Sequence, residues 1–369
     1  MEPTTTSPAS GVNDAFEEKL HRGMALARQG EYDQALAALR EAVQQKPDHT
    51  EARNCIATCC NLLGRYDDAA EAYEDLIELK PDHAGAHRGL AVAYSKLGRW
   101  PDAEALLKTA LRIKPDYAEA YHDLGNTLTI LGRFEEAVEA YRSAIRLNSQ
   151  DAEAHYHIGL TLFRMERHAE AITEFHKALL LKPDMAEAYQ YLGAVYHVSG
   201  HRTEAIAAYH DAIRLNPNEP TVHANLGCAY ADQHQYEDAT AAFNEAIRLK
   251  PDYAIAHQHL GNALASMGRR DEAVAALRQA VKLNPEQVST YYYLGSVLCD
   301  LQRMKEGTAA LREAIRRKPD YTRAHFRLGL AYATMRKFED AWKQYRILSA
   351  LDGELAAKLQ EKLPASGQR

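Results

Sequence analysis

Cysteine and histidine are the residue types here that most readily bind metals, and both occur in close pairs. Cys55 and Cys59 lie one helical turn apart and could share a metal ion. No second cysteine pair lies at the spacing of a zinc site, so reduced cysteines buried in helices are the alternative. The pairs at 155/157 and 257/259 have the pattern His-x-His, and residues two apart on a helix do not face each other. We therefore expect no metal site and no cofactor.

Motifs for catalysis are absent from the sequence. It contains no nucleophile elbow, no phosphate-binding loop and no dinucleotide-type glycine fingerprint. Glutamate and histidine can perform acid–base chemistry, but no spacing singles out a pair of them. We therefore expect a protein that is not an enzyme.

Arg323 and Arg327 have the spacing with the clearest binding chemistry. They lie one turn apart, so on a helix their guanidinium groups share a face and can hold a carboxylate by charge-assisted hydrogen bonds. The alternative is a solvated basic end of the chain that balances acidic residues elsewhere.

Composition limits the classes of partner and the location. The 369 residues are 46% apolar and carry a formal net charge of −7, which disfavours a general nucleic-acid binder. No apolar run is long enough to span a membrane, so no membrane insertion is expected. The first residues lack the basic and apolar regions of a secretory signal, so a cytoplasmic location is expected.

A repeat with a period of 34 residues runs through the chain. Prolines mark it, with Ser149 in the one place where proline is missing: Pro47, Pro81, Pro115, Pro183, Pro217, Pro251, Pro285 and Pro319. In the copy 118–151, one helical stripe of large residues precedes Gly132 and a second follows it, which predicts helix, turn, helix. Most copies close with Lys-Pro-Asp, where proline ends the second helix and aspartate can cap the next one.

The pattern resembles the tetratricopeptide repeat family, and the copy 186–219 carries its motif nearly intact: Tyr189, Leu192, Gly193, Tyr196, Ala205, Tyr209, Ala212 and Pro217. We count ten repeats, from 16–49 to 322–355. The resemblance implies an all-α, right-handed superhelical solenoid of antiparallel helix pairs. Residues 1–15 are expected to be a disordered tail. Residues 354–363 are expected to form a capping helix, with residues 356–369 holding its end and a short flexible tail.

The positions of each repeat are numbered here as slots 1–34, with residue 118 at slot 1 of the fourth repeat. Slots 2, 5, 6 and 9 share one helix face, which in the family lines a concave groove. Slots 2 and 6 predict an acidic middle of this groove that also contains a histidine: Glu119, Asp123, Glu153, His157 and Glu187. The alternative is that glutamate at slot 2 only favours a helix N-terminus.

Near the C-terminus the resemblance implies a partial carboxylate clamp, the device by which heat-shock co-chaperones of the family hold acidic C-terminal peptides. Asn262, Arg323 and Arg327 match the clamp in type. Gln258 and Tyr293 stand where the family has lysine and asparagine, which puts the usual ligand in doubt.

Aromatic residues are the remaining groove candidates. Tyr156, with Leu160 and Phe163, and Tyr292, with Phe326, would anchor a partner if exposed. The alternative is packing against neighbouring repeats.

The sequence favours a scaffold or adaptor that binds a protein or peptide in its groove. One alternative is a substrate-recruiting subunit, because the array resembles that part of O-linked N-acetylglucosamine transferases. The other is a structural protein that self-associates.

Overall fold

The structure, a computed structural model, describes residues 8–364, in which it contains 21 α-helices and no strand. The chain divides into two compact units, Met1–Pro183 and Asp184–Arg369. The helices of the N-terminal unit are α1 (Pro8–Arg28), α2 (Tyr32–Gln45), α3 (Thr50–Leu62), α4 (Tyr66–Leu79), α5 (Ala84–Lys96), α6 (Trp100–Ile113), α7 (Ala118–Ile130), α8 (Phe134–Leu147), α9 (Ala152–Arg164) and α10 (His168–Leu181). Those of the C-terminal unit are α11 (Ala186–Val198), α12 (Arg202–Leu215), α13 (Pro220–Asp232), α14 (Tyr236–Leu249), α15 (Ala254–Ser266), α16 (Arg270–Leu283), α17 (Val288–Asp300), α18 (Met304–Arg317), α19 (Thr322–Thr334), α20 (Phe338–Leu351) and α21 (Gly353–Gln360).

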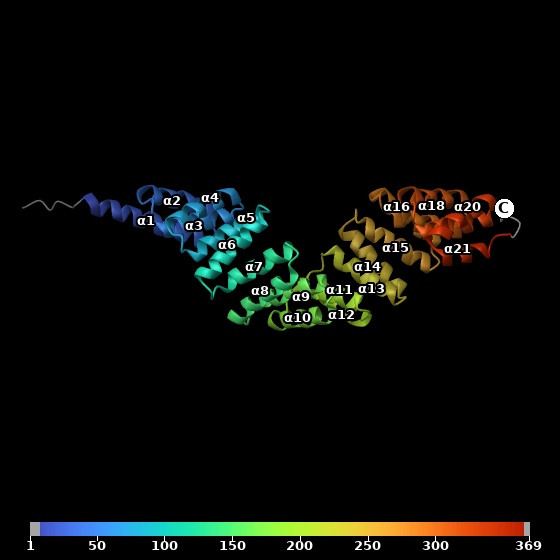
Figure 1. The fold of residues 1–369 in the computed structure, drawn as a ribbon, viewed down its shortest axis with the longest axis horizontal. Coiled ribbons are helices and arrows are strands. Elements are labelled where there is room, and N and C mark those ends of the chain that lie inside the picture. The colour runs from blue at the N-terminus through green and yellow to red at the C-terminus, as the bar shows by residue number, and fades with distance from the viewer. Residues whose placement is uncertain (1–7, 365–369) are drawn as a thin grey trace, which may run out of the picture. The chain divides into compact units, whose positions relative to one another are not determined.

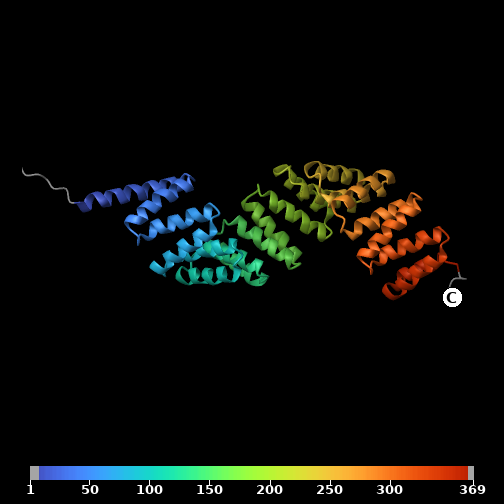
Figure 2. The same ribbon diagram turned by 90° about the horizontal axis from the view of Figure 1, so that it is seen from above.

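Each repeat contributes two consecutive helices, which pack against each other and, within each unit, against the next repeat. Figures 1 and 2 show these pairs following one another along each unit. The predicted all-α solenoid of helix pairs is confirmed.

The turn inside each repeat ends the first helix with a left-handed residue at slot 15. In the fourth repeat Gly132 has φ +76°, the Arg133 amide donates to the carbonyl of Leu128 at 2.9 Å, and the Gly132 amide donates to that of Thr129 at 3.2 Å. These two bonds form a Schellman motif, which satisfies carbonyls that the helix end leaves open. Four repeats hold a residue other than glycine in this conformation: Glu166, His234, Gln302 and Arg336.

In the fourth repeat the two helices approach closely because Gly125 at slot 8 lies against the ring of Tyr141 at slot 24. A Cβ atom added to Gly125 would lie 2.5 Å from Cε1 of Tyr141, closer than packed atoms allow. Tyr141 is 1% exposed, and burial of this ring is a main source of stability in the fourth repeat.

The expected cap by aspartate of Lys-Pro-Asp is wrong. The N-cap of α7 is Tyr117, the residue after Asp116. The residue after the aspartate is likewise the N-cap of α3, α5, α11, α15 and α19. Asp151, in the repeat that lacks proline, is one slot further along and does cap α9, because its side chain accepts from the Ala154 amide at 2.9 Å.

The N-terminal end of the array differs from expectation, and a final helix covers the C-terminal end. Residues 8–15, expected to belong to a disordered tail, form the start of α1, which begins at a proline, a residue favoured in the first turn. Residues 1–7 of that tail and 365–369 of the expected C-terminal tail lie outside the described residues. The last helix, α21, covers the tenth repeat with Leu359, which is fully buried and lies opposite Gly329.

No helix within residues 8–364 combines the length and the apolar character needed to cross a membrane.

Candidate functional site

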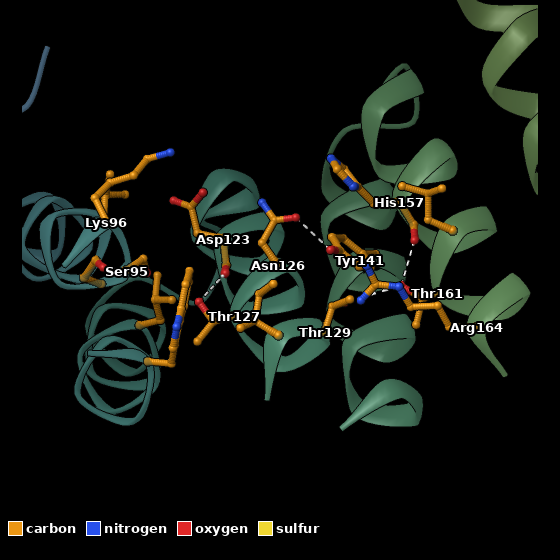
Figure 3. A pocket seen from close by; sticks show the side chains of 16 residues that line it. Ser95, Lys96, Asp123, Asn126, Thr127, Thr129, Tyr141, His157, Thr161 and Arg164 are labelled. Atoms are coloured by element: carbon orange, nitrogen blue, oxygen red, sulfur yellow. Dashed lines mark hydrogen bonds between the residues drawn. The ribbon is translucent and has the colours of Figure 1, made fainter. Parts of the chain in front are cut away.

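A cavity of about 440 Å³ lies in the N-terminal unit, on the first helices of the third, fourth and fifth repeats (Figure 3). The same slots line it from each repeat, because α5, α7 and α9 present the same face. Slot 9 contributes Val92, Asn126 and Leu160, and slot 13 contributes Lys96, Ile130 and Arg164. Trp100 and Leu107 of α6 and Tyr141 of α8 also line it.

Most polar groups of the cavity wall are engaged within the chain, as the dashed lines in Figure 3 show. The Tyr141 hydroxyl donates to Oδ1 of Asn126 at 2.7 Å. The hydroxyls of Thr127 and Thr161 each donate at 2.8 Å to a backbone carbonyl one turn earlier in their own helices. Burial raises the pKa of Tyr141, so the hydroxyl stays a donor. The wall therefore presents mainly apolar surface to an occupant.

Asp123 lies in the cavity, but its charge is compensated. Its Oδ2 accepts from Nε of Arg88, in the preceding repeat, at 2.6 Å. Burial raises the pKa of Asp123, and the Arg88 guanidinium acts against that rise.

His157 also lines the cavity and is neutral at pH 7. Its ring stacks on Tyr141, with the ring centroids 5.7 Å apart. Burial, and secondly the neighbouring His122, lower the pKa of His157 to about 4. The imidazole therefore acts there as a flat, uncharged surface.

The expected acidic middle of the groove is only partly present. Besides Asp123, Glu153 is paired, since Lys182 Nζ lies 3.2 Å from its Oε1. Glu119 is exposed in the first turn of α7, and Glu187 is exposed in the first turn of α11, in the other unit. The sequence could not show this, because the neutralising partners come from other helices.

Tyr156 is half-buried rather than presented as an anchor. Its ring lies 5.1 Å from that of His157 and 6.0 Å from that of Phe175. Leu160, by contrast, does line the cavity. Of the anchor residues predicted in the fifth repeat, Leu160 is thus the one that lines the cavity and can contact a ligand there.

The residues of the partial clamp lie in the C-terminal unit, and one of its two arginines is already engaged. Arg327 donates from Nη2 to Oδ1 of Asp300 at 2.7 Å and to the Ser296 carbonyl at 3.1 Å. Arg323 is exposed, and Asn262 is half-buried on α15.

Gln258, which replaces a clamp lysine, joins two repeats. It is 6% exposed, and its Oε1 accepts three hydrogen bonds from the ninth repeat and the turn before it: from Thr290 at 2.7 Å, Ser289 at 2.9 Å and Gln287 at 3.0 Å. The position therefore contributes to the repeat interface.

Restoring the clamp lysine should for this reason destabilise the C-terminal unit. Gln258→Lys removes the shared acceptor and buries an ammonium group, so we expect a loss of about 2 kcal/mol in the opening free energy of α17, measured by native-state hydrogen exchange. Gln190→Lys is the matched control, because Gln190 occupies the same slot of the sixth repeat, is half-buried and has no such set of donors. Equal losses in both variants would contradict this role of Gln258.

The two other aromatic candidates are packed. Phe326 and Leu330 pack against the cluster that holds α21 in place. The ring of Tyr292 lies 5.2 Å from that of Tyr293 and 5.5 Å from that of Tyr321. Neither Phe326 nor Tyr292 is therefore the exposed apolar anchor that the sequence suggested.

Slot 13 was missed as a binding position by the sequence reasoning, which followed slots 2, 5, 6 and 9. A signal was present at slot 13, the last residue of each first helix. Its occupants in the first five repeats alternate strictly between cationic and apolar: Arg28, Leu62, Lys96, Ile130 and Arg164.

Family models match almost the whole array. Models described as tetratricopeptide repeat match residues 20–76, 61–128, 152–185 and 300–354. A model described as TPR repeat matches residues 125–166, 199–234, 227–268 and 261–302. The search of curated proteins found no match.

Solved structures of other proteins match the chain, two of them with a TM-score above 0.5. The anaphase-promoting complex hetero-tetramer Cut9–Hcn1 matches with a TM-score of 0.53 and 17% identity, over 94% of this chain and 76% of that one. PilF of Pseudomonas aeruginosa matches with a TM-score of 0.51 and 21% identity, over 59% of this chain and 97% of that one. YrrB, described as a TPR protein with an unusual peptide-binding site, matches with a TM-score of 0.44 and 24% identity, over 51% of this chain and 96% of that one.

The helix pairs, the slot pattern and the family models agree along the array. The chain therefore belongs to the tetratricopeptide repeat family, whose repeats form protein-interaction scaffolds.

Proposed function

We propose that the chain is a non-catalytic scaffold or adaptor that binds a segment of a partner protein at the cavity on α5, α7 and α9. The main support for this proposal is the cavity itself, which is lined by residues at the same slots of three successive repeats and has a mainly apolar wall. Cavities of this size, apolar with a few polar groups, are typical ligand sites. The sequence's expectation of a cytoplasmic location is part of this proposal.

Carboxylate recognition near the C-terminal end is a second, finer proposal, supported by the exposure of Arg323. A ligand there would have to replace Asp300 as the partner of Arg327, so we rank this site below the cavity.

Replacing Ile130 tests the main proposal. Ile130 is 55% exposed and lines the cavity, so Ile130→Asn removes apolar contact area without changing charge or disturbing the core. Peptides selected on the wild-type chain from a random display library should bind this variant at least about tenfold more weakly, because loss of an apolar anchor contact removes one or more kcal/mol. The measurement is fluorescence anisotropy with the selected peptides.

Leu180→Asn is the matched control. Leu180 is 83% exposed and lies on α10, outside the cavity wall, so its replacement should leave the affinity unchanged. Recovery of no binding peptide, or equal affinity of all three chains for every peptide, would refute the proposal. Light scattering on the wild-type chain tests self-association, the structural alternative, since that predicts a mass that rises with concentration.

A further inference from the structure

The slot-13 residues of the N-terminal unit form a row with an alternating character. The row is cationic at Arg28, Lys96 and Arg164 and apolar at Leu62 and Ile130, and all five side chains are exposed. Lys96, Ile130 and Arg164 line the cavity together, one from each of its three repeats. The cavity therefore has an exposed apolar residue at its rim between two cations.

The charges of Lys96 and Arg164 are available to a partner. Neither side chain has an ion pair or a hydrogen bond with another of the described residues. Slot 13 of the C-terminal unit is different, because Asp232 accepts from His197 at 2.9 Å and Asp300 from Arg327 at 2.7 Å. Acids at this slot thus have hydrogen-bond partners within the chain, whereas the two cations at the cavity have none among the described residues.

No other group in the cavity wall offsets these two charges. Asp123 is compensated by Arg88, which does not line the cavity, and His157 is neutral at pH 7. Among the described residues the cavity wall thus carries a net positive charge, which selects for negative partners and speeds their association. This charge is opposite to the acidic groove that the sequence predicted.

We infer that the cavity binds a segment of another protein in which a large apolar side chain is flanked on both sides by acidic residues. The inference deepens the proposed function and rests on it. The apolar side chain packs against Ile130, Leu160 and Trp100, and the flanking carboxylates pair with Lys96 and Arg164. The long stems of both cations let the charged groups reach acids at either side of the cavity.

A charge reversal tests this inference. Peptides are selected from one random display library on the wild-type chain, on the Lys96→Glu/Arg164→Glu variant, and on a control, Lys80→Glu/Arg112→Glu. The control cations are exposed, lie in the same unit outside the cavity wall, and have no ion pair among the described residues. Circular dichroism checks that all three chains are folded.

We expect the wild type and the control to select apolar residues flanked by aspartate and glutamate, and the reversed variant to select them flanked by lysine and arginine. A fluorescent peptide made from the most enriched wild-type sequence should bind the reversed variant at least about tenfold more weakly. Its affinity for the wild type should fall when salt is raised from about 0.1 M to about 0.5 M.

Two results would overturn the inference while leaving the proposed function intact. One is selection of apolar peptides without acidic flanks, still sensitive to Ile130→Asn. The other is an acidic preference that survives the charge reversal. The mass measured by light scattering could also rise with concentration in the wild type and not in the charge-reversed variant. This result would assign the site to a second copy of this chain and would overturn the inference that the partner is another protein. Failure to select any peptide would remove both the inference and the proposed function.

Discussion

Truncating Phe175 to alanine should lower the free energy of opening of α9 and α10 by about 4 kcal/mol, the range seen when large buried rings are removed. Phe175 is 0% exposed and fills the space that Gly159 leaves, since a Cβ on that glycine would lie 2.8 Å from Cε1 of the ring. The facing residue, Gly159, has no side chain that could fill the hole. Native-state hydrogen exchange of the fifth repeat measures the loss.

Phe175→Leu is the matched control, because leucine occurs at the same slot in other repeats of this chain. Leu277 and Leu311 occupy the same slot, are both fully buried, and lie opposite glycines in the same way as Phe175. A leucine therefore fits this geometry, and its loss should be about 1 kcal/mol. If the alanine and leucine variants lost the same small amount, the ring would not be the main contact between α9 and α10.

Lowering the pH from 7 to 4 should destabilise the fold through His157 by about 3 kcal/mol. The ordinary pKa of about 6.5 holds in the unfolded chain, whereas burial and then His122 lower the pKa in the folded chain to about 4. Above pH 6.5 the ring is neutral in both states. Between pH 6.5 and 4 only the unfolded state binds the proton, so the unfolding free energy falls with pH across this window.

Urea unfolding of the wild type and of His157→Gln at pH 7 and pH 4.5 measures this effect. The variant should lose less stability than the wild type over that interval, because both share every other titrating group. His201→Gln, at an exposed histidine, should behave as the wild type does. An NMR titration that places the midpoint of His157 near pH 6.5 would disprove the proposed cause.

The helix pairs were predictable from the sequence because a period of 34 residues repeats one local solution ten times. The stripe through Tyr121, Leu124 and Leu128 gives α7, and Gly132 gives its end. The exact capping residue was not predictable, since the Lys-Pro-Asp turn ends one residue later than aspartate alone suggests.

The net charge of the groove could not be predicted from the sequence. Arg88 reaches Asp123, Lys182 reaches Glu153 and Arg327 reaches Asp300, at separations of 35, 29 and 27 residues. These separations differ because each long side chain starts from, and reaches, a different slot of the repeat. Slot identity alone therefore tells which face a residue occupies and leaves open whether its charge is free.

The three hydrogen bonds to Gln258 show that a position on the groove face can serve the contact between repeats instead of ligand binding. A repeat has few positions on its groove face, and each can either contact the neighbouring repeat or bind a ligand. In the eighth repeat slot 5 connects two repeats, so this position is not available to a ligand. In the third and fifth repeats Lys96 and Arg164 at slot 13 form no ion pair or hydrogen bond with another described residue, so these positions remain free for recognition of a partner.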